Sequence, residues 1–168
     1  MKTFSLLAAA AVAFAPVAAS AIPLPAKTYV MKAGASDMFE IESAKLESDS
    51  TDPQVSSFAQ MMIADHGKST TDVMAAASAD GLPPMTPKMT PKQASMIDSL
   101  KRTSGKARDT LYKKQQIQAH RETLAFQKQY AMSGDKPHLK DTAGMIVPVV
   151  QKHLDMVNGM SSGAIKAQ

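Results

Sequence analysis

Residues 52–81 read DPQVSSFAQMMIADHGKSTTDVMAAASADG, and this stretch predicts a long helix with one apolar face. It begins with Asp52 and Pro53, an N-cap followed by a proline at the first helical position. It ends at Gly81, a residue that commonly follows the last helical turn. A 3.6-residue period places the following residues on one stripe: Val55, Ala59, Met62, His66, Val73 and Ala77. The fold is therefore expected to consist of amphipathic helices, and a histidine is expected on a buried face.

The remaining chain divides into helices at similar signals. The expected segments are a first helix from Thr28 or Tyr29 to about Ser50, a short helix over 91–103 capped by Thr90, a long helix from Lys106 to about Met132, and a last helix from Asp135 to Asn158–Gly159. The tandem repeat MTPKMTPK at 85–92 is expected to be a loop, because its prolines interrupt a helix. We predict an all-α, antiparallel four-helix bundle, with an extra short helix before the third long helix and a kink at Pro148 in the fourth.

The N-terminal segment has the pattern of a secretory signal peptide. Lys2 precedes a short apolar run, and Ala19-Ser20-Ala21 supplies the small residues that a signal peptidase requires. We expect cleavage after Ala21 and a periplasmic or secreted protein, with no transmembrane segment after cleavage. The expected domains are the signal peptide 1–21, an extended leader 22–27, a helical domain 28–160 and a flexible tail 161–168.

The composition excludes some chemistry and disfavours some partners. The chain has no cysteine, so disulfides and thiolate ligands are absent. Eight basic residues lie within 88–114, but few aromatic residues accompany them, so we do not expect nucleic-acid binding. This segment is expected to be a solvated helix face; an anionic envelope surface or a protein partner is the alternative.

Three of the four histidines are predicted to face the interior from three different helices. His66, His120 and His153 each fall on an apolar stripe, whereas His138 lies near a helix start and is expected to be exposed. On the first helix, Glu42 falls near the middle of the apolar face. Glu40 points roughly away from that face, but its height along the helix matches that of the histidines better. Counting about 1.5 Å per residue puts His66 and His120 at one level, with His153 and Glu42 each displaced by about a turn.

These residues suit a metal site but also permit other interpretations. His66, His120, His153 and one carboxylate, Glu42 or Glu40, could bind a single transition metal ion, with zinc, iron, manganese and copper all compatible. The alternative is that the histidines are core residues hydrogen-bonded to neighbours. A third interpretation is an acid–base or pH-sensing role. The expected hydrogen-bond partners are Asp65, Asp155, Tyr112 or Gln116, and the methionines that could serve a separate copper site are Met61, Met62, Met85, Met89 and Met96.

Four stretches resemble a bacterial protein family labelled domain of unknown function 4142. They are SDMFEIESAKL (36–46), the segment 52–83, ARDTLYKKQQIQAHRETLAF (107–126) and VPVVQKHLDM (147–156). The resemblance covers about residues 28–160, and its most specific parts are Asp65-His66, the Asp109…Tyr112…His120 spacing and Pro148…His153. It implies an exported, ferritin-like four-helix bundle whose biochemical activity is not established.

The sequence departs from the di-iron pattern of ferritin-like proteins. Such a site needs a Glu-x-x-His pair on each of two helices. Here Ile63 stands three residues before His66, and Val150 stands three residues before His153. We therefore expect an exported helical protein with an envelope or stress-related role, which binds one metal ion and is not an enzyme. The alternatives are a metal-dependent oxidoreductase that uses the same core site, and a structural or partner-binding module without metal.

Overall fold

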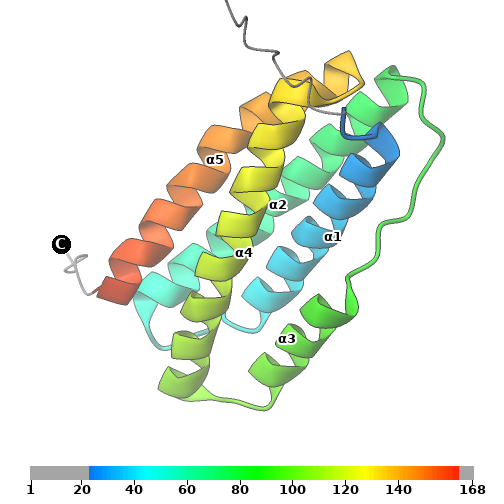
Figure 1. The fold of residues 1–168 in the computed structure, drawn as a ribbon. Coiled ribbons are helices and arrows are strands. Elements are labelled where there is room, and N and C mark those ends of the chain that lie inside the picture. Colours follow the sequence, from blue (N-terminus) through cyan, green and yellow to red (C-terminus); the bar gives the residue numbers. More distant parts are fainter. Residues whose placement is uncertain (1–22, 163–168) are drawn as a thin grey trace, which may run out of the picture.

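The computed structural model describes residues 23–162, and it is all-helical over that range, as predicted. The helices are α1 (Ala26–Lys45), α2 (Pro53–Ala79), α3 (Pro91–Lys101), α4 (Gly105–Ser133) and α5 (Pro137–Ser162) (Figure 1). The expected signal peptide 1–21 and residues 163–168 of the expected tail lie outside the described residues. Within 23–162, no helix combines the length and the apolar character that crossing a membrane requires.

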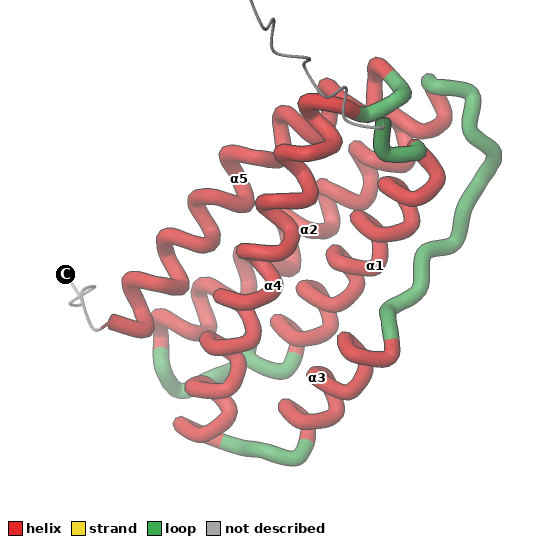
Figure 2. Tube along the Cα trace, viewed as in Figure 1, coloured by secondary structure: helices red, strands yellow, loops and turns green. Residues whose placement is uncertain are grey.

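The four long helices enclose a common interior. Helix α1 packs against α2, α2 against α5, α5 against α4, and α4 more sparsely against α1. Successive partners run in opposite directions, because short connections join α1 to α2 and α4 to α5 (Figures 1 and 2). The short helix α3 lies outside this group, against α1 and α4. Residues on all four long helices can therefore meet in one interior.

Local signals in the sequence define several helix ends as expected. The Asp52 side chain accepts a hydrogen bond of 3.0 Å from the Gln54 amide at the start of α2. Helix α2 ends before Gly81, whose φ of +77° is a conformation that glycine adopts readily. Thr90 and Gln93 form a reciprocal capping box at the start of α3. These caps explain why the predicted boundaries of α2 and α3 agree with the structure to within two residues.

Helix α1 and helix α5 differ from the expected boundaries. Helix α1 begins at Ala26, because Pro25 caps it in an extended conformation, so the extended leader is shorter than predicted. It ends at Lys45 rather than Ser50, and the chain tightens into turns in which the Leu46 amide donates to the Ser43 carbonyl. Helix α5 begins two residues later than expected, and it continues to Ser162, into the segment expected to be a tail.

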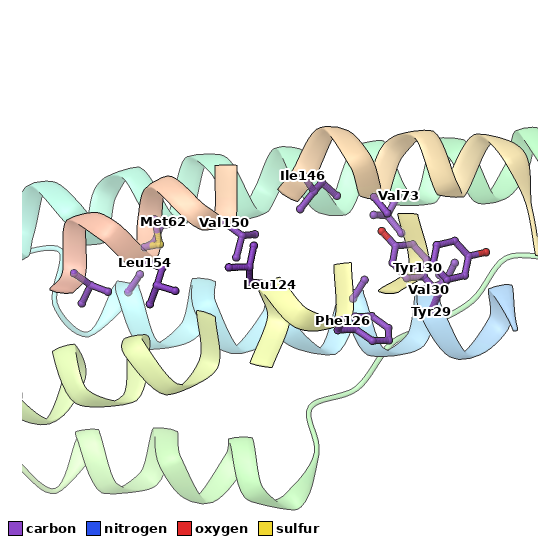
Figure 3. Close-up of a cluster of buried hydrophobic side chains, with 14 of the residues drawn as sticks. Tyr29, Val30, Met62, Val73, Leu124, Phe126, Tyr130, Ile146, Val150 and Leu154 are labelled. Atoms are coloured by element: carbon purple, nitrogen blue, oxygen red, sulfur yellow. The ribbon is translucent and has the colours of Figure 1, made fainter. Parts of the chain in front are cut away.

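The apolar core extends along the whole interior (Figure 3). Tyr29, Phe126 and Tyr130 gather at the end where α1 begins, and Met62 and Leu154 lie toward the other end. The loop after α2 crosses α1 at Gly34, where any side chain would overlap the Pro87 ring. Gly34 therefore permits the close approach that holds this loop against α1.

Candidate metal centre

Three imidazole rings meet in the interior between α2, α4 and α5. His66, His120 and His153 are buried, with at most 4% of each residue exposed, which confirms that they face inward. Their ring centroids form a nearly equilateral triangle with sides of 5.7, 5.6 and 5.5 Å. The predicted displacement of His153 by about a turn is therefore wrong. The later start of α5 accounts for about 3 Å of the difference.

Each of the three rings uses one nitrogen to donate a hydrogen bond away from the cluster. His66 Nδ1 lies 2.8 Å from an Asp37 carboxylate oxygen, and His120 Nδ1 lies 2.9 Å from the Gln116 carbonyl oxygen. His153 Nε2 lies 2.9 Å from an Asp65 carboxylate oxygen. Because these oxygens accept hydrogen bonds, the bonded ring nitrogen carries the proton and the other nitrogen of a neutral ring has a free lone pair. The tautomer of each ring is thereby set.

The second nitrogen of each ring has no hydrogen-bond partner among residues 23–162. These atoms are His66 Nε2, His120 Nε2 and His153 Nδ1, and all three are buried. A buried polar atom without a partner costs about 1–3 kcal/mol. Hydrogen bonding to neighbours, the alternative interpretation of these histidines, is present at Asp37, Asp65 and Gln116, but it accounts for only half of the ring nitrogens.

The spacing of the ligand atoms fits one metal ion after a small adjustment. One potential ligand atom from each histidine lies within 4.8 Å of the other two. A point equidistant from three atoms with that separation lies about 2.8 Å from each, whereas a zinc–imidazole bond is about 2.0–2.1 Å. Shifts of less than about 1 Å per ring would therefore bring all three nitrogens to bonding distance. The outward hydrogen bonds are of the kind that orients imidazole ligands in metal proteins.

The prediction that Glu42 lies on the buried face of α1 is wrong. Glu42 is exposed and pairs with Lys45 at 2.7 Å on the surface, whereas Glu40 is buried. A Glu40 carboxylate oxygen lies 3.6 Å from His120 Nδ1, beside the hydrogen-bonded nitrogen rather than the free one. Glu40 thus places a carboxyl group next to the cluster, and Asp37 of the same helix orients His66.

The apolar residues of α1 do not by themselves mark its buried face. The buried positions follow a 3–4–3–4 spacing that includes acidic side chains, while Met38 is 38% exposed. This stripe comprises Ala26, Val30, Ala33, Asp37, Glu40, Ala44 and Glu47. The small residues on the stripe were the signal that could have located Asp37 and Glu40.

Burial and mutual repulsion keep two of the rings neutral. Burial, followed by the nearby His66 and His153 rings, lowers the pKa of His120 to about 3. Burial also lowers the pKa of His153 to about 4, although Asp65 opposes this shift. Neutral imidazole is the form that binds a metal ion, so these two rings are ready for coordination near pH 7.

The pKa values of His66 and Glu40 are both raised, so His66 binds a proton more readily than an ordinary histidine and Glu40 loses its negative charge more readily than an ordinary glutamate. Burial alone would lower the pKa of His66, but the hydrogen bond to Asp37 and the charge of Glu40 outweigh it and raise the pKa. Burial raises the pKa of Glu40 to about 7, and His66 opposes that shift. A proton and a metal ion would therefore compete mainly at His66.

A groove between α2 and α5 reaches the cluster from the surface. Its volume is about 580 Å³, and its lining includes His66 and His153 together with Asp37 and Asp65. The Asp65 side chain is 39% exposed, so a carboxylate stands where solvent meets the cluster. An ion could thus approach the imidazoles without passing through the packed core. His138, which also lines this groove, has a side chain 60% exposed, as predicted.

Comparison with known proteins identifies the fold and the family. The DUF305 fragment from Deinococcus radiodurans is 14% identical, with a TM-score of 0.71, over 84% of this chain and 99% of that one. A structure described as CopM in the Cu(II)-bound form is 12% identical, with a TM-score of 0.70, over 86% and 100% of the two chains. No curated protein matches the sequence. A family model matches residues 11–160, so the chain belongs to the family described as Domain of unknown function (DUF4142).

Proposed function

We propose that this protein binds one transition metal ion through His66 Nε2, His120 Nε2 and His153 Nδ1. The observation that carries the proposal is a set of three buried ring nitrogens without a hydrogen-bond partner among residues 23–162, on three imidazoles that each offer a ligand atom within 4.8 Å of the other two. A bound cation would satisfy all three atoms at once, and it would favour the ionised form of the neighbouring Glu40. Asp37 and Asp65 would orient two of the ligands and balance the charge of the ion.

Copper is the first metal to test, because the similar CopM structure is described as Cu(II)-bound. Imidazole ligands also suit zinc and iron, so the ion must be identified by measurement. We infer that the protein acts as an exported, ferritin-like four-helix bundle that binds metal in the cell envelope. Cleavage after Ala21 would deliver it there, and N-terminal sequencing of the exported protein should begin at Ile22.

Elemental analysis of the untagged, exported protein tests the metal site. We expect about one equivalent of a transition metal in the wild type and none in the variant His66→Ala/His153→Ala. A His138→Ala variant is the matched control, because His138 is exposed and paired with Asp80 at 2.8 Å. Two equivalents in the wild type would contradict a single-ion site, and wild-type protein that stays metal-free in added copper, zinc or iron would contradict the proposal.

A metal-dependent oxidoreductase is the second candidate, supported by the number of ligands. The described residues bring three histidines together but no carboxylate into the same group. Catalytic metal sites commonly keep such an open position for water or substrate. If the centre is redox-active, an added reductant should abolish the paramagnetic resonance signal of the copper-loaded protein, and dioxygen should restore it. A signal that survives reduction would contradict this second function.

A further inference from the structure

A second groove opens between α1, α3 and α4, and its lining includes none of the three clustered histidines. Its volume is about 750 Å³, within the range of small-molecule sites. It exists because α1 and α4 pack less extensively against each other than the other neighbouring pairs of long helices do. The short helix α3 covers only part of their length (Figure 1). The part that α3 leaves uncovered is a concave surface on the side of the molecule that carries the loop between α2 and α3.

The floor of this groove is apolar. Phe39 and Ala35 of α1 are buried beneath it, and Phe126 of α4 is 7% exposed. The half-buried side chains of Met31 and Met96 complete the floor from α1 and α3. Methionines at such a surface adapt their shape to different apolar ligands. The floor thus offers apolar surface from three helices to a flexible hydrocarbon chain.

The rim of the groove is strongly basic. The charged residues among its described lining are Lys27, Lys32, Lys88, Lys92 and Glu122. Lys92 pairs with Glu122 at 2.9 Å, which leaves an excess of three positive charges. The Lys32 ammonium lies 4.2 Å from the centre of the Phe126 ring, at the boundary between rim and floor.

The tandem repeat MTPKMTPK supplies two of the four lysines of this rim. Its two lysines, Lys88 and Lys92, are four residues apart and both line the groove, as do Lys27 and Lys32 of α1. The loop is held in place where Pro87 contacts α1 at Gly34, and where the Gln93 amide group donates to the Ala35 carbonyl at 3.2 Å. The repeat therefore builds a fixed basic edge.

We propose that the α1–α3–α4 groove binds a single-chain anionic amphiphile, namely a long-chain fatty acid. Its hydrocarbon chain would lie on the floor formed by Phe39, Met31 and Phe126, and its carboxylate would meet the lysines of the rim. The charge excess selects an anion, and the apolar floor selects a chain rather than a small hydrophilic anion. Lysine suits this position because its stem packs on apolar groups while its ammonium stays in water. The proposal does not depend on metal binding.

Titration calorimetry with monomeric sodium alkyl carboxylates tests the site. We expect saturable binding of one molecule per protein. Reversing two rim charges in Lys32→Glu/Lys88→Glu should weaken binding by about tenfold or more. The matched control is Lys106→Glu/Lys114→Glu, because both residues are exposed, belong to the same basic segment and do not line the groove. Equal weakening in both variants would show that the effect comes from net charge alone, and it would overturn the proposal.

Ligand series separate the floor from the rim. Each added methylene should strengthen binding by about fourfold until the groove is filled. An alcohol of equal chain length should bind about tenfold more weakly than the carboxylate, because it lacks the charge that faces the lysines. Equal affinities for alcohol and carboxylate, or many weak sites, would overturn the proposal. Binding to anionic phospholipid vesicles without binding to the monomeric carboxylate would also overturn it. That result would indicate that this face binds a membrane surface.

Discussion

The interior contains a tyrosine cluster, Tyr29 and Tyr130, and a histidine cluster, His66, His120 and His153. The two clusters differ in whether their polar atoms have hydrogen-bond partners. In the tyrosine cluster, the Tyr29 and Tyr130 rings stack with centroids 3.9 Å apart. The Tyr29 hydroxyl donates to Gln127 at 2.8 Å, and the Tyr130 hydroxyl donates to Asp135 at 3.1 Å. In the histidine cluster, each ring has one satisfied nitrogen and one without a partner in the described chain. Both clusters are almost inaccessible to solvent.

This difference supports the proposal that the histidine cluster, unlike the tyrosine cluster, is a binding site. A buried cluster that only holds helices together satisfies its polar groups within the protein, because each unsatisfied group reduces stability. The tyrosine cluster meets that requirement. The histidine cluster instead leaves three lone pairs on facing rings, with firm outward hydrogen bonds that orient them. Under the proposed function a metal ion would satisfy these atoms, and four predictions test this contrast.

Removing a ring from the tyrosine cluster should have the largest effect on folding. We expect Tyr29→Ala to lower the free energy of unfolding by about 3–5 kcal/mol, because it creates a cavity between Tyr130 and Phe126. Chemical denaturation measures the change. Met132→Ala, in the last turn of α4 close to Tyr130 in sequence, is the control and should stay within about 0.5 kcal/mol, since Met132 is 75% exposed. A loss below about 1 kcal/mol for Tyr29→Ala would show that this cluster is not a main structural element.

Metal addition should stabilise the protein only through the histidine cluster. At a free metal concentration about 100 times the dissociation constant, the free energy of unfolding should rise by about 2.7 kcal/mol. The variant His66→Ala/His153→Ala should show no rise. Gln127→Ala, which removes the partner of Tyr29, should be less stable but should keep the full response. Thermal unfolding with and without metal distinguishes these outcomes, and a response in the double histidine variant would place the ion elsewhere.

Removing the residue that orients His66 should weaken metal binding without abolishing it. Asp37→Ala should reduce metal affinity by about 10–100-fold, because it deletes the partner of His66 Nδ1. Glu42→Ala is the control on the same helix and should leave the affinity unchanged, since Glu42 pairs with Lys45 on the surface. Competition with a chelator of known affinity measures both. A larger effect for Glu42→Ala would place Glu42 rather than Asp37 beside the histidines.

The smallest effect is expected at Asp80, near the tyrosine cluster, where the carboxylate receives hydrogen bonds from the start of α5. It accepts them from the Leu139 amide at 2.9 Å, and from the amide and ring of His138 at 3.2 and 2.8 Å. Asp80→Ala should therefore cost about 1 kcal/mol at pH 7. Burial alone would raise the pKa of Asp80, but these hydrogen bonds outweigh burial and lower it.

The pH dependence at Asp80 follows from the sign of that shift. A lowered pKa in the folded state stabilises the protein above the usual aspartate pKa of about 3.9, and this contribution is lost as the pH falls below it. The stability difference between wild type and Asp80→Ala should thus be full at pH 7 and should shrink at pH 3. A difference that grows on acidification would contradict this assignment.

The helical secondary structure and most helix boundaries could be predicted, because the signals that set them lie within a few residues of each boundary. Asp52-Pro53 and Thr90-Pro91 carry their own capping groups, and Gly81 adopts its positive φ regardless of distant neighbours. The end of α1 at Lys45 has no comparable local signal, and the turn that follows it pairs the buried Glu47 with Arg108, a residue 61 positions away. The inward direction of the three histidines was also predictable, since each shares a stripe with apolar neighbours.

The sequence by itself determined the helices, the family and the three inward histidines, because periodicity and capping act within a few residues. Only the tertiary structure decided that the rings meet at one level, that Asp37 and Glu40 rather than Glu42 lie beside them, and that four lysines surround an apolar groove. These facts depend on the relative stagger and separation of helices. Packing between distant segments sets those quantities, and no local pattern in the chain records them.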